Sequence, residues 1–132
     1  MAKPVKGAGP KINTDPYPRQ DYWKALEMMG TRMSFSQEKY GDLEVNYPEP
    51  KSAMATAMQR IGMYHASGNT EHLLDAANML VIEHLFPSHA DAHFEAEGSE
   101  LSPGLRDRAD EAIWMQVKVW DNNAESIEPL QG

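Results

Sequence analysis

Apolar residues recur every three or four positions in four stretches of the chain, which is the spacing of amphipathic α-helices. The first predicted helix runs from Arg19 to about Tyr40, and Gly41 suits the position that ends it. Its apolar row is Tyr22, Leu26, Met29 and Met33. Gly30 lies inside this helix at a cost of about 1 kcal/mol relative to alanine, and therefore predicts close packing or a bend there.

The second and third stretches predict an antiparallel pair of helices over about 52–67 and 70–86, because very few residues connect them. Gly68 suits the left-handed position after a helix, and Asn69 or Thr70 can cap the next one. The third helix is apolar around most of its circumference, which is typical of a central, buried helix. We therefore expect one of its polar rows to be incompletely solvated.

A fourth helix is predicted over about 105–121, with a core row of Ala109, Ala112, Ile113, Val117 and Trp120. Proline-bearing loops cover 41–50 and 87–104, and Pro87 ends the third helix. The predicted fold is an all-α, four-helix bundle-like domain over 19–121, with an extended N-terminal arm and a long loop before the last helix. Residues 122–132 form a polar tail.

Composition narrows the class of protein. The chain has 132 residues, which favours one domain, and it has no cysteine, which excludes disulfides and thiolate zinc sites. No apolar run approaches the ~20 residues of a membrane span, and no apolar stretch follows the N-terminal lysines as in a signal peptide. We therefore expect a soluble protein of the cytoplasm, or of the host cytoplasm if a phage encodes it.

The charge is negative overall and unevenly distributed. The formal net charge of −8 argues against general nucleic-acid binding, which requires clustered cations. The first 24 residues nevertheless carry five basic and two acidic side chains. Residues 1–18 also contain four prolines, so the arm is either a disordered leader or a segment that docks on a partner. Because so small a domain buries little surface, we expect a homo-oligomer or a complex with another protein.

Glu71, Asp75 and Asn78 form the strongest candidate site, because spacings of four and three place them on one face of the third helix. Clustered oxygen ligands of this kind attract Mg²⁺. The alternative is that Asp75 pairs with Arg60 or Arg32 while Asn78 bonds the backbone, since buried charges are normally paired.

The first helix offers a second polar row, which is either a further half of the site or a solvated stripe. Its members are Glu27, Thr31, Ser34 and Glu38. If this row faced Glu71 and Asp75, four carboxylates would meet between two helices.

These motifs carry a resemblance. The run Glu38-Lys39-Tyr40-Gly41, then Arg60, then Thr70-Glu71 followed by Asp75-Ala76-Ala77-Asn78, resembles small phage-associated helical proteins related to the MazG-like, all-α nucleoside triphosphate pyrophosphohydrolases. The resemblance covers roughly residues 20–85 and implies a helical bundle, Mg²⁺ and a nucleotide substrate. The family places paired acids on two successive core helices, whereas residues 51–70 contain no acid. Either Glu38 and Glu27 substitute, or the chain is a non-catalytic relative.

Two classes of function remain open after this resemblance is considered. The first is a Mg²⁺-dependent nucleotide pyrophosphohydrolase or nucleotide-binding protein, with Glu38, Glu71 and Asp75 as metal ligands. Lys39 or Arg60 would contact phosphate, and Asn78 would contribute to substrate binding. The second is a non-enzymatic phage interaction protein, a virion component or an inhibitor of a host factor, acting through its acidic helical surface and basic arm.

The histidines are a separate, weaker candidate for a metal site. His89 and His93 have the i, i+4 spacing of a zinc-binding pair on a helix, with His84, Asp91 and Glu95 nearby. Pro87 argues against a helix there, which favours surface histidines instead.

Overall fold

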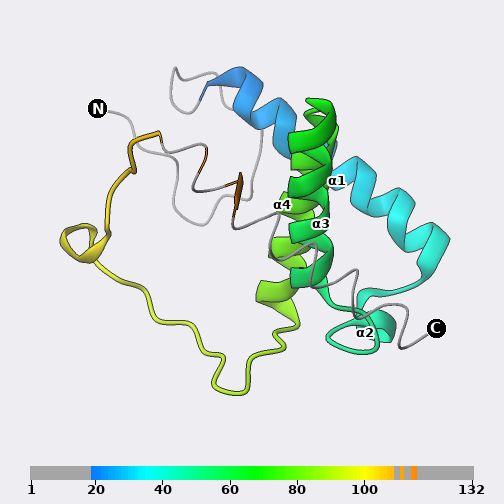
Figure 1. The fold of residues 1–132 in the computed structure, drawn as a ribbon. Helices are drawn as coiled ribbons and strands as arrows, with labels where there is room; N and C mark the ends of the chain where they lie inside the picture. The colour runs from blue at the N-terminus through cyan, green and yellow to red at the C-terminus, as the bar shows by residue number, and fades with distance from the viewer. Residues whose placement is uncertain (1–18, 109–110, 112–113, 116–132) are drawn as a thin grey trace.

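The computed structural model describes residues 19–108, 111, 114 and 115, and it is all-α over these residues. Its helices are α1 (Gln20–Tyr40), α2 (Leu43–Asn46), α3 (Ala53–Ser67) and α4 (Glu71–Leu85), followed by one 3-10 turn, η1 (Ser99–Leu101) (Figure 1). No strand occurs among the described residues. The all-α fold class and the positions of the first three predicted helices are confirmed.

The helix ends follow from local sequence signals. Gly41 and Gly68 both have positive φ, at 93° and 76°, and each donates its N–H to the last turn of the preceding helix. Ser52 caps α3 by accepting a hydrogen bond from the N–H of Ala55 at 3.0 Å. Before α4, the side chain of Asn69 accepts from the N–H of Glu71 at 3.0 Å. Each of these predicted helix ends is therefore closed by an identifiable hydrogen bond.

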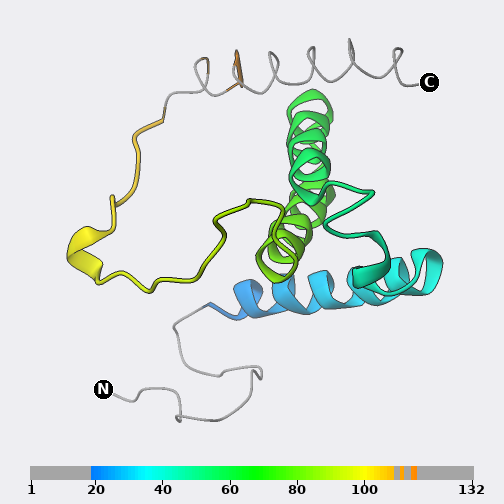
Figure 2. The ribbon, with the colours of Figure 1, turned by 90° about the horizontal axis from the view of Figure 1, so that it is seen from below.

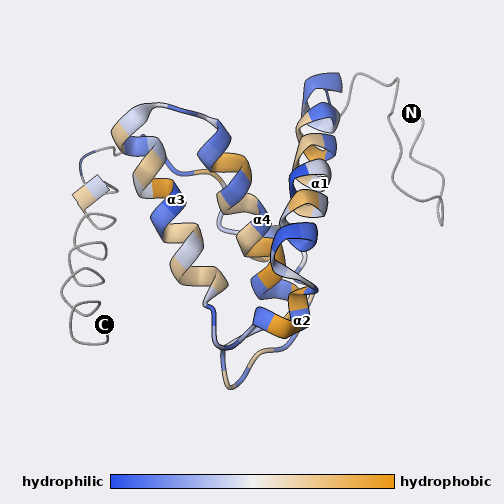
Figure 3. Ribbon diagram, turned by 90° about the vertical axis from the view of Figure 1, so that its right-hand side faces the viewer, coloured by the Kyte–Doolittle hydropathy of each residue, from blue (hydrophilic) through white to orange (hydrophobic). Residues whose placement is uncertain are grey.

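Helix α4 is central, as its sequence predicted. It packs along α3 in an antiparallel pair, and α1 crosses it on another side (Figures 1 and 2). Coloured by hydropathy, α4 lies between the other two long helices (Figure 3). The buried apolar side chains are mostly small, which lets the helix axes approach closely: Ala53, Ala57, Ala76 and Ile82.

Two parts of the expected fold need correction. The predicted loop at 41–50 contains the short helix α2, which is held against α1 because Asn46 Nδ2 donates to the carbonyl of Tyr40 at 3.2 Å. Residues 105–108 are not helical, so the last predicted helix does not begin at Leu105. Glu111, Trp114 and Met115 are helical, while the rest of that helix lies outside the described residues. The arm at 1–18 and the tail at 122–132 also lie outside them. Within the described part of the chain, no helix is long and apolar enough to cross a membrane.

Gly30 does not mark a close approach in α1. A Cβ atom added there would meet nothing within 4 Å, so the expected close packing at this glycine is wrong.

Replacing Gly30 with alanine should therefore stabilise the protein. The substitution adds no clash and removes the backbone freedom that glycine retains in the unfolded chain, so we expect a gain of about 0.5–1 kcal/mol in the free energy of unfolding. Chemical denaturation of the wild type and Gly30→Ala measures the difference. As a control, Gly41→Ala should destabilise, because Gly41 has a φ of 93°. A loss of stability in Gly30→Ala would contradict the open geometry at this position.

Candidate functional site

Arg32 in the middle of α1 joins that helix to two carboxylates on α4. Its Nε donates to Asp75 Oδ1 at 2.7 Å and its Nη2 to Asp75 Oδ2 at 2.9 Å, so the contact with Asp75 is bidentate. Its Nη1 donates to Glu71 Oε2 at 2.7 Å. The alternative in which Asp75 pairs with an arginine is thus confirmed, and Arg32 is the partner.

The two carboxylates stabilise the charged form of the Arg32 guanidinium and raise its pKa. The hydrogen bonds that Arg32 donates to Asp75 raise the pKa of Arg32, its partial burial opposes that shift, and the charges of Asp75 and Glu71 raise the pKa further. Arg32 is therefore a permanent cation that is outnumbered by its two carboxylate partners, so that the three groups carry a net charge of −1. It contributes little uncompensated positive charge to its surroundings.

Asn78 makes the second polar contact between α1 and α4, and it is nearly inaccessible to solvent. Asn78 is only 7% exposed, and its Nδ2 donates to the carbonyl of Met29 at 2.9 Å. This contact ties the middle of α4 to the backbone of α1.

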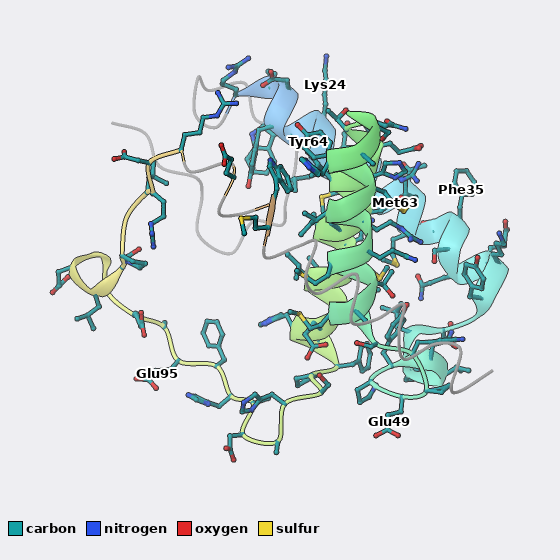
Figure 4. All side chains as sticks on the ribbon, viewed as in Figure 1. Lys24, Phe35, Glu49, Met63, Tyr64 and Glu95 are labelled. Carbon is teal, nitrogen blue, oxygen red and sulfur yellow. The ribbon has the colours of Figure 1, made fainter. Side chains whose placement is uncertain are left out.

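A pocket of about 270 Å³ opens between α1, α3 and α4, next to these contacts. Most of its lining comes from the C-terminal half of α1, and α3 contributes Arg60. The lining residues are Arg32, Met33, Phe35, Ser36, Lys39, Tyr40, Arg60, Asp75, Asn78 and Met79. Phe35 is largely exposed and projects outward from α1 (Figure 4).

Two cations in this lining have no carboxylate partner among the described residues. Lys39 places its Nζ 5.1 Å from the centre of the Tyr40 ring, a cation–π contact. Arg60 donates from Nη1 to the side-chain oxygen of Gln59 and to Met63 Sδ, both uncharged. Within the described part of the chain, neither Lys39 nor Arg60 forms an ion pair. The pocket therefore carries uncompensated positive charge on an acidic protein.

The structure brings most of the predicted site residues together. Lys39, Arg60 and Asn78 all line the pocket, as does Asp75. Glu71 lies beside it and reaches the same arginine as Asp75. Glu38 is exposed and does not line the pocket.

The polar row of the first helix is exposed at all of its positions, as in the solvated-stripe alternative: Glu27, Thr31, Ser34 and Glu38. Among the described residues, no group of three or more histidine, aspartate or glutamate side chains could hold a metal ion. Magnesium binding by Glu38, Glu71 and Asp75 stays a prediction.

His89 and His93 lie in a non-helical segment, so their spacing does not place them on one helical face. His89 Nδ1 accepts from the N–H of Asp91 at 2.9 Å, and His93 Nε2 lies 3.4 Å from Glu95 Oε1. Both rings are exposed, which matches the expectation of surface histidines.

The aromatic wall of the pocket is the part that sequence reasoning missed. The sequence assigned Met33 to the apolar row of the first helix, gave Tyr40 only as the end of that helix and as part of the resemblance, and gave Phe35 no role. One signal was present in the sequence. Arg32, Ser36 and Lys39 recur at i, i+4 and i+7, so they form a polar row on one helical face, and aromatic residues lie next to that row.

Comparison of the chain with protein-family models, curated proteins and solved structures found no match. The resemblance to MazG-like proteins stays a prediction, and the pocket itself is the feature from which a function can be inferred.

Removing the charge of Asp75 should destabilise the protein. In Asp75→Asn, Arg32 loses its bidentate partner and keeps only Glu71, so we expect a loss of about 1–3 kcal/mol in the free energy of unfolding. The matched control is Glu71→Gln, because this carboxylate is half exposed and should cost less than about 1 kcal/mol. Urea denaturation measures both. Unchanged or increased stability in Asp75→Asn would instead indicate that repulsion between Asp75 and Glu71 outweighs their attraction to Arg32.

Tyr47 gives a pH dependence above neutrality. Burial raises the pKa of its phenol, which Arg60 partly offsets, and its hydroxyl donates to Met79 Sδ at 3.8 Å. Because the folded state favours the protonated phenol, this contribution to stability is complete below a pH of about 10 and is lost as the pH rises through the raised pKa.

Ultraviolet titration of phenolate formation should therefore show one tyrosine that ionises later than an exposed tyrosine such as Tyr22. In Tyr47→Phe this late transition should be missing, and the loss of stability at alkaline pH should be shallower. A late transition that persists in Tyr47→Phe would assign it to a different tyrosine.

Proposed function

We propose that the pocket between α1, α3 and α4 binds a small nucleotide. The observation that carries the proposal is the pair Lys39 and Arg60, two cations without carboxylate partners that line one pocket from two different helices. Uncompensated cations that converge on a concave surface favour a phosphate-bearing ligand.

The phosphate end of the ligand lies at these cations. Arg60 offers a planar, multiply donating guanidinium and Lys39 a point charge, which together suit phosphate oxygens. Arg32 is occupied by Asp75 and Glu71, so it orients α1 and does not compete for the phosphate.

The remaining lining suits the other half of a nucleotide. Tyr40 and Phe35 provide aromatic rings for stacking of a base, and Asn78, which also lines the pocket, carries an amide oxygen that can accept from a base amino group or a ribose hydroxyl. The volume of about 270 Å³ is at the small end for ligand pockets, which favours a mononucleotide over a dinucleotide.

Magnesium enters this proposal as the counter-ion of the nucleotide phosphates. Asp75 and Glu71 both pair with Arg32, so a metal ion held by them would first have to displace the guanidinium. We propose binding and not hydrolysis. A phage-type, MazG-like relative that binds a nucleotide without catalysis is compatible with this proposal.

Isothermal titration of the full chain with nucleoside mono- and triphosphates, with and without Mg²⁺, tests the proposal. Inorganic phosphate and the free nucleosides complete the panel and separate the phosphate contribution from stacking. We expect a nucleotide to bind, and Lys39→Ala or Arg60→Ala to weaken its affinity about 10- to 100-fold, because each removes a charge-assisted contact.

Lys24→Ala is the matched control, since Lys24 is an exposed lysine of the same helix that points away from the pocket (Figure 4). It should leave the affinity within about twofold, as expected for a screened, distant charge. No heat from any nucleotide, or equal effects of Lys39→Ala and Lys24→Ala, would reject the pocket as a nucleotide site. That result would leave the interaction-protein alternative.

A further inference from the structure

Along its whole length, one side of α4 carries apolar side chains that are partly exposed. Its large side chains on that side are all between 38% and 55% exposed: Leu73, Leu80, Val81 and Leu85. The only polar side chain among them is His84. Four exposed aliphatic residues on one helix form a patch of the kind that marks an interaction site.

Leu73 and Leu80 lie on the side of α4 that faces away from α1. Successive residues of a helix are rotated by about 100°, which places Leu73 and Leu80 on the opposite side from Asp75. Asp75 contacts α1 through Arg32. Leu73 and Leu80 are therefore separated from the pocket by the body of the helix.

Helix α3 extends this surface with a second apolar row. Met54, Ile61 and His65 lie about 100–140° around the helix from Arg60, which faces the pocket. Met54 is exposed and Ile61 is half-buried. We call the two rows together, on α3 and α4, the outer face of the helical pair.

The chain after α4 returns to the outer face at two described positions. Phe94 packs edge-on against His84 of α4, with ring centres 6.2 Å apart. Trp114 stacks on His65 of α3, with ring centres 4.2 Å apart and planes at 23°, and it also lies 6.5 Å from the ring of Tyr64. Tyr64 projects toward this side of α3 (Figure 4). Residues at both ends of the long connection thus contact the same surface.

We propose that the outer face is a docking surface for this chain's own residues 114–120. Their sequence, WMQVKVW, contains five apolar residues and one charged residue, Lys118. Trp114 is already seated on α3, and it and Met115 are helical. In a helix, Trp114, Val117 and Trp120 fall within an arc of about 120°, and their span of about 9 Å would cover about half of the distance of roughly 18 Å between Leu73 and Leu85.

The length of the connection favours the same chain over a second copy. Residues 86–113, at about 3.3 Å per extended residue, reach much farther than the roughly 22 Å length of α4. A tether that spans its site easily gives an effective local concentration in the millimolar range. A second copy at micromolar concentration competes poorly with such a segment.

Hydrogen–deuterium exchange of the full chain tests whether the segment is docked. Leu80→Lys places a charge in the outer face, so amide exchange in residues 114–120 should become about tenfold faster or more. Met28→Lys is the matched control, because Met28 is exposed to a similar degree, 54% against 47%, but lies on α1. It should leave exchange in this segment unchanged.

Far-ultraviolet circular dichroism verifies that both variants keep the helical fold. If Leu80→Lys does not fold, Trp114→Ala takes its place, since it removes the seated ring and leaves α4 intact. Faster exchange in 114–120 with an unchanged control supports the proposal. Exchange that is equally fast in the wild type and all variants overturns it.

A spin label identifies which copy is the occupant. The chain has no cysteine, so Met115→Cys, an exposed position next to Trp114, takes a single nitroxide. Broadening of α3 and α4 amides within the labelled, ¹⁵N-enriched molecule is the expected result. Equal broadening of an unlabelled ¹⁵N copy, mixed with a spin-labelled ¹⁴N copy, would assign the surface to a second copy and overturn the proposal.

Discussion

The attachment of α1 to the rest of the protein depends on polar contacts more than on apolar ones. Arg32 holds Asp75 and Glu71, and Asn78 holds the backbone of Met29. None of the buried apolar side chains in the described residues belongs to α1. Since polar contacts are directional, they fix the position of α1 on α4 even where little apolar area is buried. The pocket exists because α1 is held there.

This division explains how one helix serves two surfaces. The side of α4 toward α1 carries carboxylates and an amide that orient its neighbour, and the opposite side carries aliphatic residues that need a cover. Between them, Ala76 and the alanines of α3 let the helical pair pack closely. Substitutions on one side of α4 should therefore leave the properties of the other side nearly unchanged, as expected for residues without shared partners.

Most of the fold was predictable from local signals, and much less of the site was. Glycines at 41 and 68 and the cap at Ser52 mark helix ends because they act within one turn, and sequence spacing alone captures this. The choice of Arg32 rather than Arg60 as the partner of Asp75 depends on how two distant helices cross, which periodicity does not encode. The aromatic wall was missed for the same reason, because an apolar residue at helical spacing looks alike in a core and in a pocket.

The segment from Pro87 to Arg108 has a consequence for how this chain tolerates change. Apart from the one turn η1, it has no helix, and nearly all of its described side chains are exposed. The entropy of closing a loop rises only with the logarithm of its length, so added or deleted residues there alter stability little. Relatives of this chain can therefore differ widely in length between Pro87 and Arg108 while keeping α1, α3 and α4 unchanged, and a reporter peptide is best inserted at this point.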